Sequence, residues 1–182
     1  MKTIKLNHSI MVVLIALAGV TASVQAADLA LFGNDAKWEF KKNTGNGSFT
    51  VATDADGKRI GILNYDFSNP LGAKTPYVIA FTPVEIAEGS SHVVLSARSS
   101  LAQPLTFRLV DSTGQTHQFK SRIKGSGQWE TIKIPMTRKL EHWGGAADGT
   151  IHYPVRSIAI SVPRPSETAT VGKVEFADIK VE

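Results

Sequence analysis

Residues 105–120 read LTFRLVDSTGQTHQFK, two runs of β-favouring residues separated by an Asp-Ser-Thr-Gly turn. In the first run Leu105, Phe107 and Leu109 alternate with other side chains, which is the two-residue period of a strand with one buried face. With a turn of two central residues, Arg108 pairs with His117 across the hairpin. We therefore predict that the hairpin has an apolar inner face and carries Arg108 and His117 together on its outer, polar face.

The remainder of the chain continues this strand pattern, and no segment shows the period of a helix. Residues 127–135 read GQWETIKIP and residues 171–182 read VGKVEFADIKVE. Between them, residues 142–149 read HWGGAADG, which we interpret as a glycine-rich loop that carries His142 and Trp143. We predict strands at residues 48–53, 58–67, 77–86, 92–98, 105–111, 114–122, 129–134, 155–162 and 171–181. Short strands separated by Gly, Pro and Asn predict an all-β fold, a jelly-roll β-sandwich of two antiparallel sheets.

Several short motifs resemble those of galactose-binding-like jelly rolls. The motifs are Asp111 with Gly114-Gln115, Trp129 with Ile132, Ile134 and Pro135, Trp143-Gly144-Gly145, Asp148-Gly149, Pro154, and Phe176 with Asp178-Ile179. From Trp38 onward the chain resembles the family eleven carbohydrate-binding modules, the complex I intermediate-associated proteins and the accessory jelly-roll domains of bacterial glycosidases. One departure is Ala177, which stands where these families usually have the first Asp of an Asp-Asp-Ile motif. The resemblance implies a domain that binds glycans and does no chemistry.

The first 26 residues have the features of a secretory signal peptide. Lys2 and Lys5 precede an uncharged apolar run at residues 10–20, and Val24-Gln25-Ala26 provides a small-residue cleavage site. The apolar run is shorter than the roughly 20 residues that a membrane-spanning helix needs. We therefore predict a signal peptide at residues 1–26, a single β-sandwich domain at residues 27–182, and a secreted or periplasmic location in a bacterium.

The charge balance and the cysteine content of the chain bear on its binding partners and on what holds the domain together. Loss of residues 1–26 would leave 18 of the 20 basic residues against 16 acidic ones, and no strand carries a clustered basic footprint. This balance argues against nucleic acid as a partner. The chain has no cysteine, so an exported domain of this size has to be held by its core or by a metal ion and not by disulfides.

Sugar recognition requires an aromatic ring for the apolar face of a pyranose, together with planar polar groups for its hydroxyls. One set of candidates surrounds the glycine-rich segment, namely His142, Trp143, His152 and Tyr153. Another set lies on the outer, polar face of the predicted hairpin, namely Arg108, Gln115 and His117. The alternative for Trp143 is a structural role, in which its ring closes one end of the sandwich.

The resemblance also implies one structural calcium ion near the terminal strand. It assigns Asp178 as a ligand, with Glu39 from the first strand as a second ligand; carboxylate oxygens suit this hard cation. The segment Asp54-Ala55-Asp56-Gly57 imitates the start of a calcium-binding loop but lacks the later ligands. We interpret that segment as a hairpin turn.

Three classes of function remain open at this point. The first is an exported, non-catalytic domain that recognises a polysaccharide or oligosaccharide. The second is a periplasmic or surface scaffold that binds another protein, because a fold alone does not decide function. The third is a jelly-roll polysaccharide lyase built on Arg108, Gln115, His117 and Tyr153, although the usual lyase strand motifs are missing.

Overall fold

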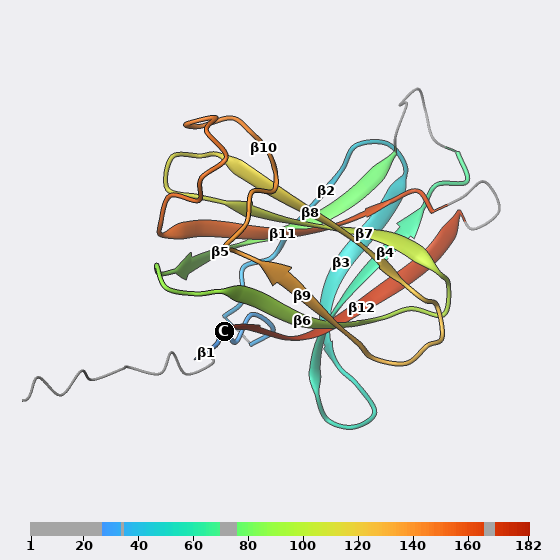
Figure 1. The fold of residues 1–182 in the computed structure, drawn as a ribbon. Coiled ribbons are helices and arrows are strands. Elements are labelled where there is room, and N and C mark those ends of the chain that lie inside the picture. The colour runs from blue at the N-terminus through green and yellow to red at the C-terminus, as the bar shows by residue number, and fades with distance from the viewer. Residues whose placement is uncertain (1–26, 34, 70–75, 166–169) are drawn as a thin grey trace, which may run out of the picture.

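The computed structural model describes residues 27–33, 35–69, 76–165 and 170–182. These residues form two antiparallel sheets packed face to face, the predicted jelly-roll β-sandwich (Figure 1). The predicted signal peptide at residues 1–26 lies outside the described residues. Within the described residues, no helix is long and apolar enough to cross a membrane.

Sheet A has the strand order β3-β4-β12-β6-β9, and β1 pairs with β12 beside the C-terminal end of the chain (Figure 1). Its strands are β1 (Ala27–Asp28), β3 (Asn46–Thr53), β4 (Arg59–Asp66), β6 (His92–Arg98), β9 (Glu130–Pro135) and β12 (Val171–Val181). The terminal strand β12 therefore lies inside the sheet, between β4 and β6.

Sheet B has the strand order β10-β8-β7-β11-β5-β2. Its strands are β2 (Glu39–Lys42), β5 (Tyr77–Ile86), β7 (Gln103–Val110), β8 (Thr116–Ile123), β10 (Glu141–Trp143) and β11 (Val155–Pro163). All nine segments predicted as strands are confirmed, with ends that differ by at most two residues. Strand β10 was not predicted; two of its three residues, His142 and Trp143, lie in the segment interpreted as a glycine-rich loop.

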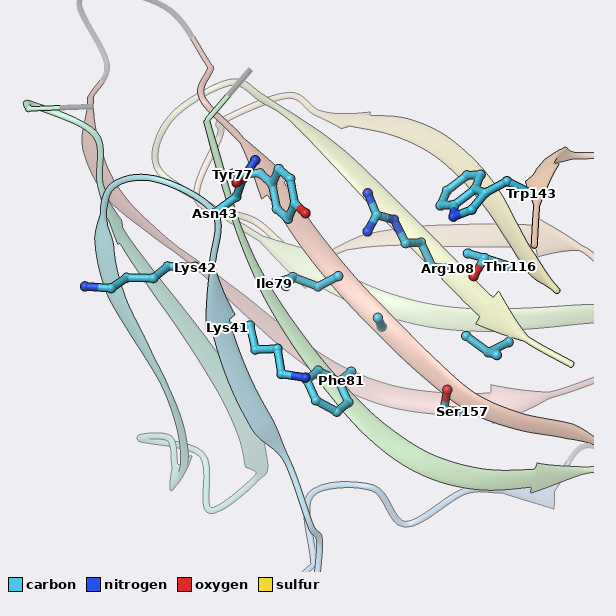
Figure 2. Close-up of a pocket in the computed structure, with 12 residues that line it drawn as sticks. Lys41, Lys42, Asn43, Tyr77, Ile79, Phe81, Arg108, Thr116, Trp143 and Ser157 are labelled. Carbon is cyan, nitrogen blue, oxygen red and sulfur yellow. The ribbon is translucent and has the colours of Figure 1, made fainter. Parts of the chain in front are cut away.

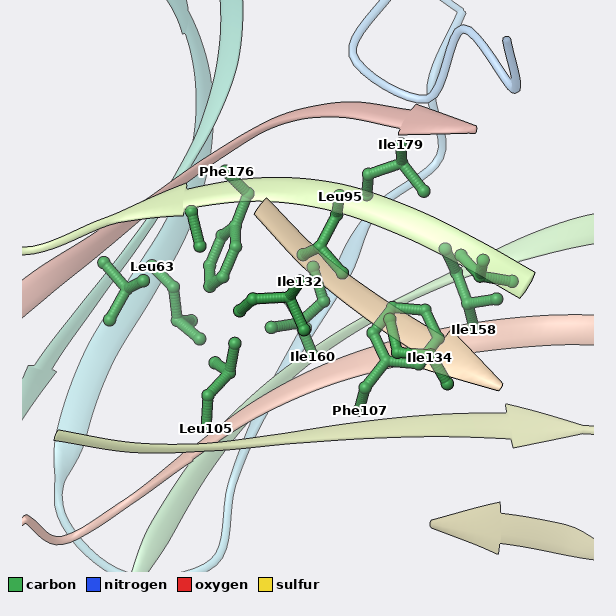
Figure 3. Packing of buried hydrophobic residues seen from close by; sticks show 14 of the residues in the cluster. Leu63, Leu95, Leu105, Phe107, Ile132, Ile134, Ile158, Ile160, Phe176 and Ile179 are labelled. Atoms are coloured by element: carbon green, nitrogen blue, oxygen red, sulfur yellow. The ribbon is translucent and has the colours of Figure 1, made fainter. Parts of the chain in front are cut away.

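The core lies between the inner faces of the two sheets. Alternate residues of β7 and β11, such as Phe107, Ile158 and Ile160, point inward and are buried (Figure 3). From sheet A, Ile134 and Phe176 meet them and are fully buried (Figure 3). Because strand side chains alternate between faces, this buried set leaves the outer face of each sheet free for other roles.

The hairpin of β7 and β8 differs from the predicted pairing by one residue. The structure pairs Arg108 with Gln118, and Leu109 with His117. The cause is Gly114, whose φ of +83° adds a third residue to the turn, while the Gly114 amide donates to the Asp111 carbonyl. A shift of one residue exchanges the two faces of a strand, so His117 lies on the inner side with Leu109.

The turn at residues 54–57 is a plain hairpin turn, as predicted. The Gly57 amide donates to the Asp54 carbonyl, and the Asp54 carboxylate accepts from the amides of Asp56 and Lys58. By accepting these hydrogen bonds from backbone amides, the Asp54 carboxylate closes the turn between β3 and β4.

Candidate functional site

The outer face of sheet B carries a groove of about 430 Å³ (Figure 2). Strands β2, β5, β7, β8, β10 and β11 all contribute side chains to it. The lining residues are Lys41, Lys42, Asn43, Tyr77, Ile79, Phe81, Arg108, Val110, Thr116, Trp143, Ser157 and Ala159.

Small side chains on the central strand form the floor of this groove. On β11, Ser157 and Ala159 point outward, while the larger Ile158 and Ile160 point into the core. Ala159 lies between Phe81 on one neighbouring strand and Arg108 on the other. A row of small residues flanked by larger ones leaves a depression along the sheet.

Strand β5 supplies an apolar wall that sequence reasoning missed. Tyr77, Ile79 and Phe81 point outward and are partly exposed, whereas Val78 and Ala80 between them are fully buried. The available signal was an alternation in which both faces of the strand are apolar, with two aromatic residues, Tyr77 and Phe81, on the outer face. Such a wall suits the apolar face of a sugar ring.

Arg108 lies in the middle of the groove between two aromatic rings (Figure 2). Its guanidinium carbon is 5.4 Å from the ring centroids of both Tyr77 and Trp143. Arg108 Nε donates to Gln118 Oε1 at 2.9 Å, and Gln118 in turn donates to Glu141 at 2.8 Å. These contacts hold the guanidinium in the groove with its planar group between the two rings.

Trp143 lies at the end of β10, where it pairs with Thr116 of β8. Its side chain is 45% exposed, and it is one of two large exposed hydrophobic residues in the described structure. The interpretation of residues 142–143 as a loop is therefore wrong, because β8 extends the sheet and holds them as an edge strand. The strand fixes the ring of Trp143 at one side of the groove.

A buried polar network lies behind this edge strand, centred on Asp111. Its Oδ1 accepts from the amides of Thr113 and Gln115 at 2.9 and 3.0 Å. Its Oδ2 accepts from the His152 amide at 3.1 Å and lies 3.2 Å from Nε2 of His117. Burial alone would raise the pKa of Asp111, but the hydrogen bonds from Thr113, His152 and His117 outweigh burial and hold that pKa well below its usual range.

Gln115 and His117 belong to this network and not to the groove. Both side chains are buried, so the prediction that they lie on the outer face of the hairpin is wrong. Gln115 Nε2 donates to the Thr150 carbonyl at 2.8 Å, and Gln115 Oε1 accepts from the Gly149 amide at 3.2 Å. The network thereby ties the β7–β8 turn to the segment that follows Trp143.

The two remaining candidate histidines, His142 and His152, also support this segment. His142 is on the opposite face of β10 from Trp143 and donates from Nδ1 to the Leu140 carbonyl at 3.0 Å. His152 donates from Nε2 to Asp148 at 2.9 Å. Hydrogen bonds from the Thr150 amide and the His152 ring lower the pKa of Asp148 to about 2.

Tyr153 packs against the hydrophobic core, and burial raises the pKa of its phenol. Of the seven residues predicted to bind ligand, Arg108 and Trp143 therefore line the groove. His142, His152, Gln115, His117 and Tyr153 lie outside the lining and hold the end of the sandwich that carries Trp143.

The predicted calcium ligands do not come together. Glu39 lies on β2 in sheet B, and Asp178 lies on β12 in sheet A, at a register shift of the strand with φ of +50°. The Asp178 carboxylate forms an ion pair with Lys58 and accepts from the Ser96 hydroxyl at 3.3 Å. Among the described residues, no three His, Cys, Asp or Glu side chains gather as a metal site. These residues do not fit a calcium ion shared by Asp178 and Glu39.

Comparison with solved structures identifies proteins of the same fold. The family 11 carbohydrate-binding module from Clostridium thermocellum, in complex with a β-1,3-1,4-mixed-linked tetrasaccharide, aligns with a TM-score of 0.67 and 15% identity over 88% of this chain and 96% of that chain. The family 11 module of the cellulosomal cellulase Lic26A-Cel5E of the same organism aligns with a TM-score of 0.64 and 14% identity, over 88% and 95% of the two chains.

A family 61 module in complex with β-1,4-galactotriose aligns with a TM-score of 0.51 and 11% identity, over 80% of this chain and 87% of that chain. The resemblance to jelly-roll carbohydrate-binding modules is thus confirmed at the level of the fold. No protein-family model and no curated protein sequence matches the chain.

Proposed function

We propose that the chain is an exported, non-catalytic carbohydrate-binding domain, and that the groove on the outer face of sheet B holds a segment of a polysaccharide. One observation carries this proposal: Tyr77 and Trp143 place two aromatic rings in one groove, on either side of the Arg108 guanidinium (Figure 2).

This arrangement matches the chemistry of sugar binding. Pyranose rings present apolar C–H faces that stack on aromatic side chains, and hydroxyls that bond to planar polar groups. The groove supplies both kinds of partner, since Asn43, Thr116 and Ser157 add hydrogen-bonding groups to its lining. Because the lining spans several neighbouring strands, it can contact more than one sugar of a chain.

Binding without cleavage is supported by the charges in the groove. Hydrolysis of a glycosidic bond usually requires two carboxyl groups flanking the bond. The described lining contains Lys41, Lys42 and Arg108 but no Asp or Glu. The solved modules with the same fold support the proposal as well, since one is in complex with a mixed-linked tetrasaccharide and another with galactotriose.

Export to the periplasm or beyond is part of the proposal. It rests on the basic start, the apolar run at residues 10–20 and the cleavage pattern at residues 24–26. Its check is the mass of the protein recovered from a bacterial periplasm or medium, which should correspond to a chain that begins at Ala27.

The test of sugar binding compares matched tryptophan variants on a panel of plant, algal and bacterial polysaccharides. Trp143→Ala should weaken binding by about tenfold or more, because stacking adds about 1 kcal/mol to the burial of the ring. Trp129→Ala is the control, since Trp129 lies on the outer side of sheet A, with the Arg98 guanidinium 4.3 Å from its ring centroid.

Affinity electrophoresis and calorimetry measure the binding, and analysis of the glycans after incubation measures cleavage. Equal affinity of the folded Trp143→Ala variant and the parent would remove the groove from the account. Release of shorter oligosaccharides would show catalysis and contradict the proposal. Failure to bind any polysaccharide would favour the scaffold function instead.

A further inference from the structure

The groove on sheet B has a charge that the composition of the chain does not explain. We infer that it selects polysaccharides with anionic groups, either uronic acid carboxylates or sulfate esters. This inference rests on the proposed function and adds the class of glycan to it.

Two cations from different strands reach into the groove, Arg108 in its middle and Lys41 at its edge on β2 (Figure 2). Arg108 comes from β7, and Lys41 comes from the edge strand β2, with its ammonium 4.6 Å from the Phe81 ring centroid (Figure 2). The third lining cation, Lys42, directs its ammonium away from the groove and donates to Asn46 at 3.1 Å (Figure 2). Two positive charges, those of Arg108 and Lys41, therefore face the groove (Figure 2).

No acidic side chain of the described residues lines the groove to neutralise these charges. The neighbouring carboxylate of Glu141 is bound by Lys120 at 2.7 Å and by Gln118 at 2.8 Å. Beyond residue 26 the chain has 18 basic and 16 acidic residues, so its overall charge is close to balanced. The excess of positive charge is thus a property of the groove.

The geometry of Arg108 suits an anionic ligand. Its Nε is occupied by Gln118, and its two terminal nitrogens have no hydrogen-bond partner among the described residues. Those nitrogens form a planar fork that can donate two parallel bonds to a carboxylate or sulfate. With aromatic rings on both sides, the same site can stack a sugar and bind its charged substituent.

Matched glycans separate this inference from the proposed function. The full chain, produced with its own N-terminal segment, is titrated with polygalacturonate and with its methyl ester, which has the same backbone without the charge. A second pair compares the sulfated κ-carrageenan with the same polymer after chemical removal of its sulfate esters. In at least one pair, the charged polysaccharide should bind about tenfold more tightly than its uncharged form. A preference within the first pair indicates a carboxylate ligand, and a preference within the second pair indicates a sulfate ester.

Arg108→Gln should abolish this preference, whereas Lys133→Gln should retain it. Lys133 is the control because it lies on β9 in the other sheet and loses the same charge. Raising the salt from about 0.05 M to about 0.5 M should weaken binding of the charged glycan and leave that of the neutral one unchanged.

Equal affinity for charged and neutral glycans, with dependence on Trp143 intact, would overturn this inference and leave the proposed function standing. Equally tight binding of a single-stranded DNA oligonucleotide would also overturn it, because the attraction would then be unspecific. If no glycan of either kind binds, the proposed function fails together with the inference.

Discussion

Removal of the Asp111 carboxylate should destabilise the protein more than any other change to a polar side chain considered above. In Asp111→Ala the amides of Thr113, Gln115 and His152 lose their acceptor, and His117 loses its charged partner. Each buried donor left without a partner costs about 1–3 kcal/mol. Since the Asp111 and His117 side chains are fully buried, water cannot readily replace these bonds.

We expect Asp111→Ala to lower the free energy of unfolding by about 3–5 kcal/mol. Domains of this size are stable by only about 5–15 kcal/mol, so the loss is a large share of the total. Asp111→Asn keeps one acceptor oxygen but turns an NH₂ group toward the His152 amide, and it should cost about 2 kcal/mol. This milder variant remains measurable if the alanine variant fails to fold.

Asp54→Ala is the matched control. Asp54 begins the other Asp-x-x-Gly turn and accepts from the amides of Asp56 and Lys58 at 3.0 and 2.9 Å, but it is partly exposed. Asp54→Ala should lower the free energy of unfolding by about 1 kcal/mol, because water can accept hydrogen bonds from the released amides. Urea unfolding, followed by fluorescence, measures all three variants. A cost for Asp111→Ala no greater than that for Asp54→Ala would refute the reasoning.

Three further predictions follow from the same region and from the metal assignment. First, the pKa values of Asp111 and Asp148 are lower in the folded chain than in the unfolded one. The stability that their carboxylates contribute is therefore present above about pH 4 and should be lost as the pH falls toward 2. Asp111→Asn should reduce this dependence of the free energy of unfolding on acid pH, measured by urea titration. Second, Gly145→Ala should lower the melting temperature by more than Gly89→Ala. Both glycines have positive φ, but a Cβ at Gly145 would lie 2.6 Å from a side-chain oxygen of the neighbouring turn, whereas Gly89 faces open space. The melting temperature should be the same in chelator and in excess calcium, because the Asp178 carboxylate is already paired within the protein; a fall on chelation would instead support a calcium ion there.

The sequence was sufficient to predict nine of the strands, because one buried face imposes a period of two. Ile132 and Ile134 are buried as the alternation predicts, and so are Ile158 and Ile160. The turn was harder to predict, because two-residue and three-residue turns share the same residue types. One positive φ at Gly114 decided the register, and that choice moved His117 from the outer face to the inner one.

The groove could not be predicted from local patterns. Tyr77, Arg108 and Ser157 lie on three strands that are distant in the sequence, and only the order β7-β11-β5 in sheet B brings them together. Trp143 was recognised as a candidate because an aromatic residue before two glycines is a local feature. Its place on an edge strand depends on pairing with β8, which is a tertiary contact.

The three tryptophans of the chain report on three separate places, and their indole N–H signals in a proton–nitrogen NMR spectrum test the central claim directly. Trp38 donates to the Leu31 carbonyl and stacks on Phe32. Trp129 lies on the outer side of sheet A, and Trp143 lies in the groove on sheet B. On titration with an oligosaccharide that binds, the Trp143 signal should shift progressively while the other two stay in place. A shift of the Trp129 signal with Trp143 unchanged would contradict the account and place the binding site on the opposite sheet.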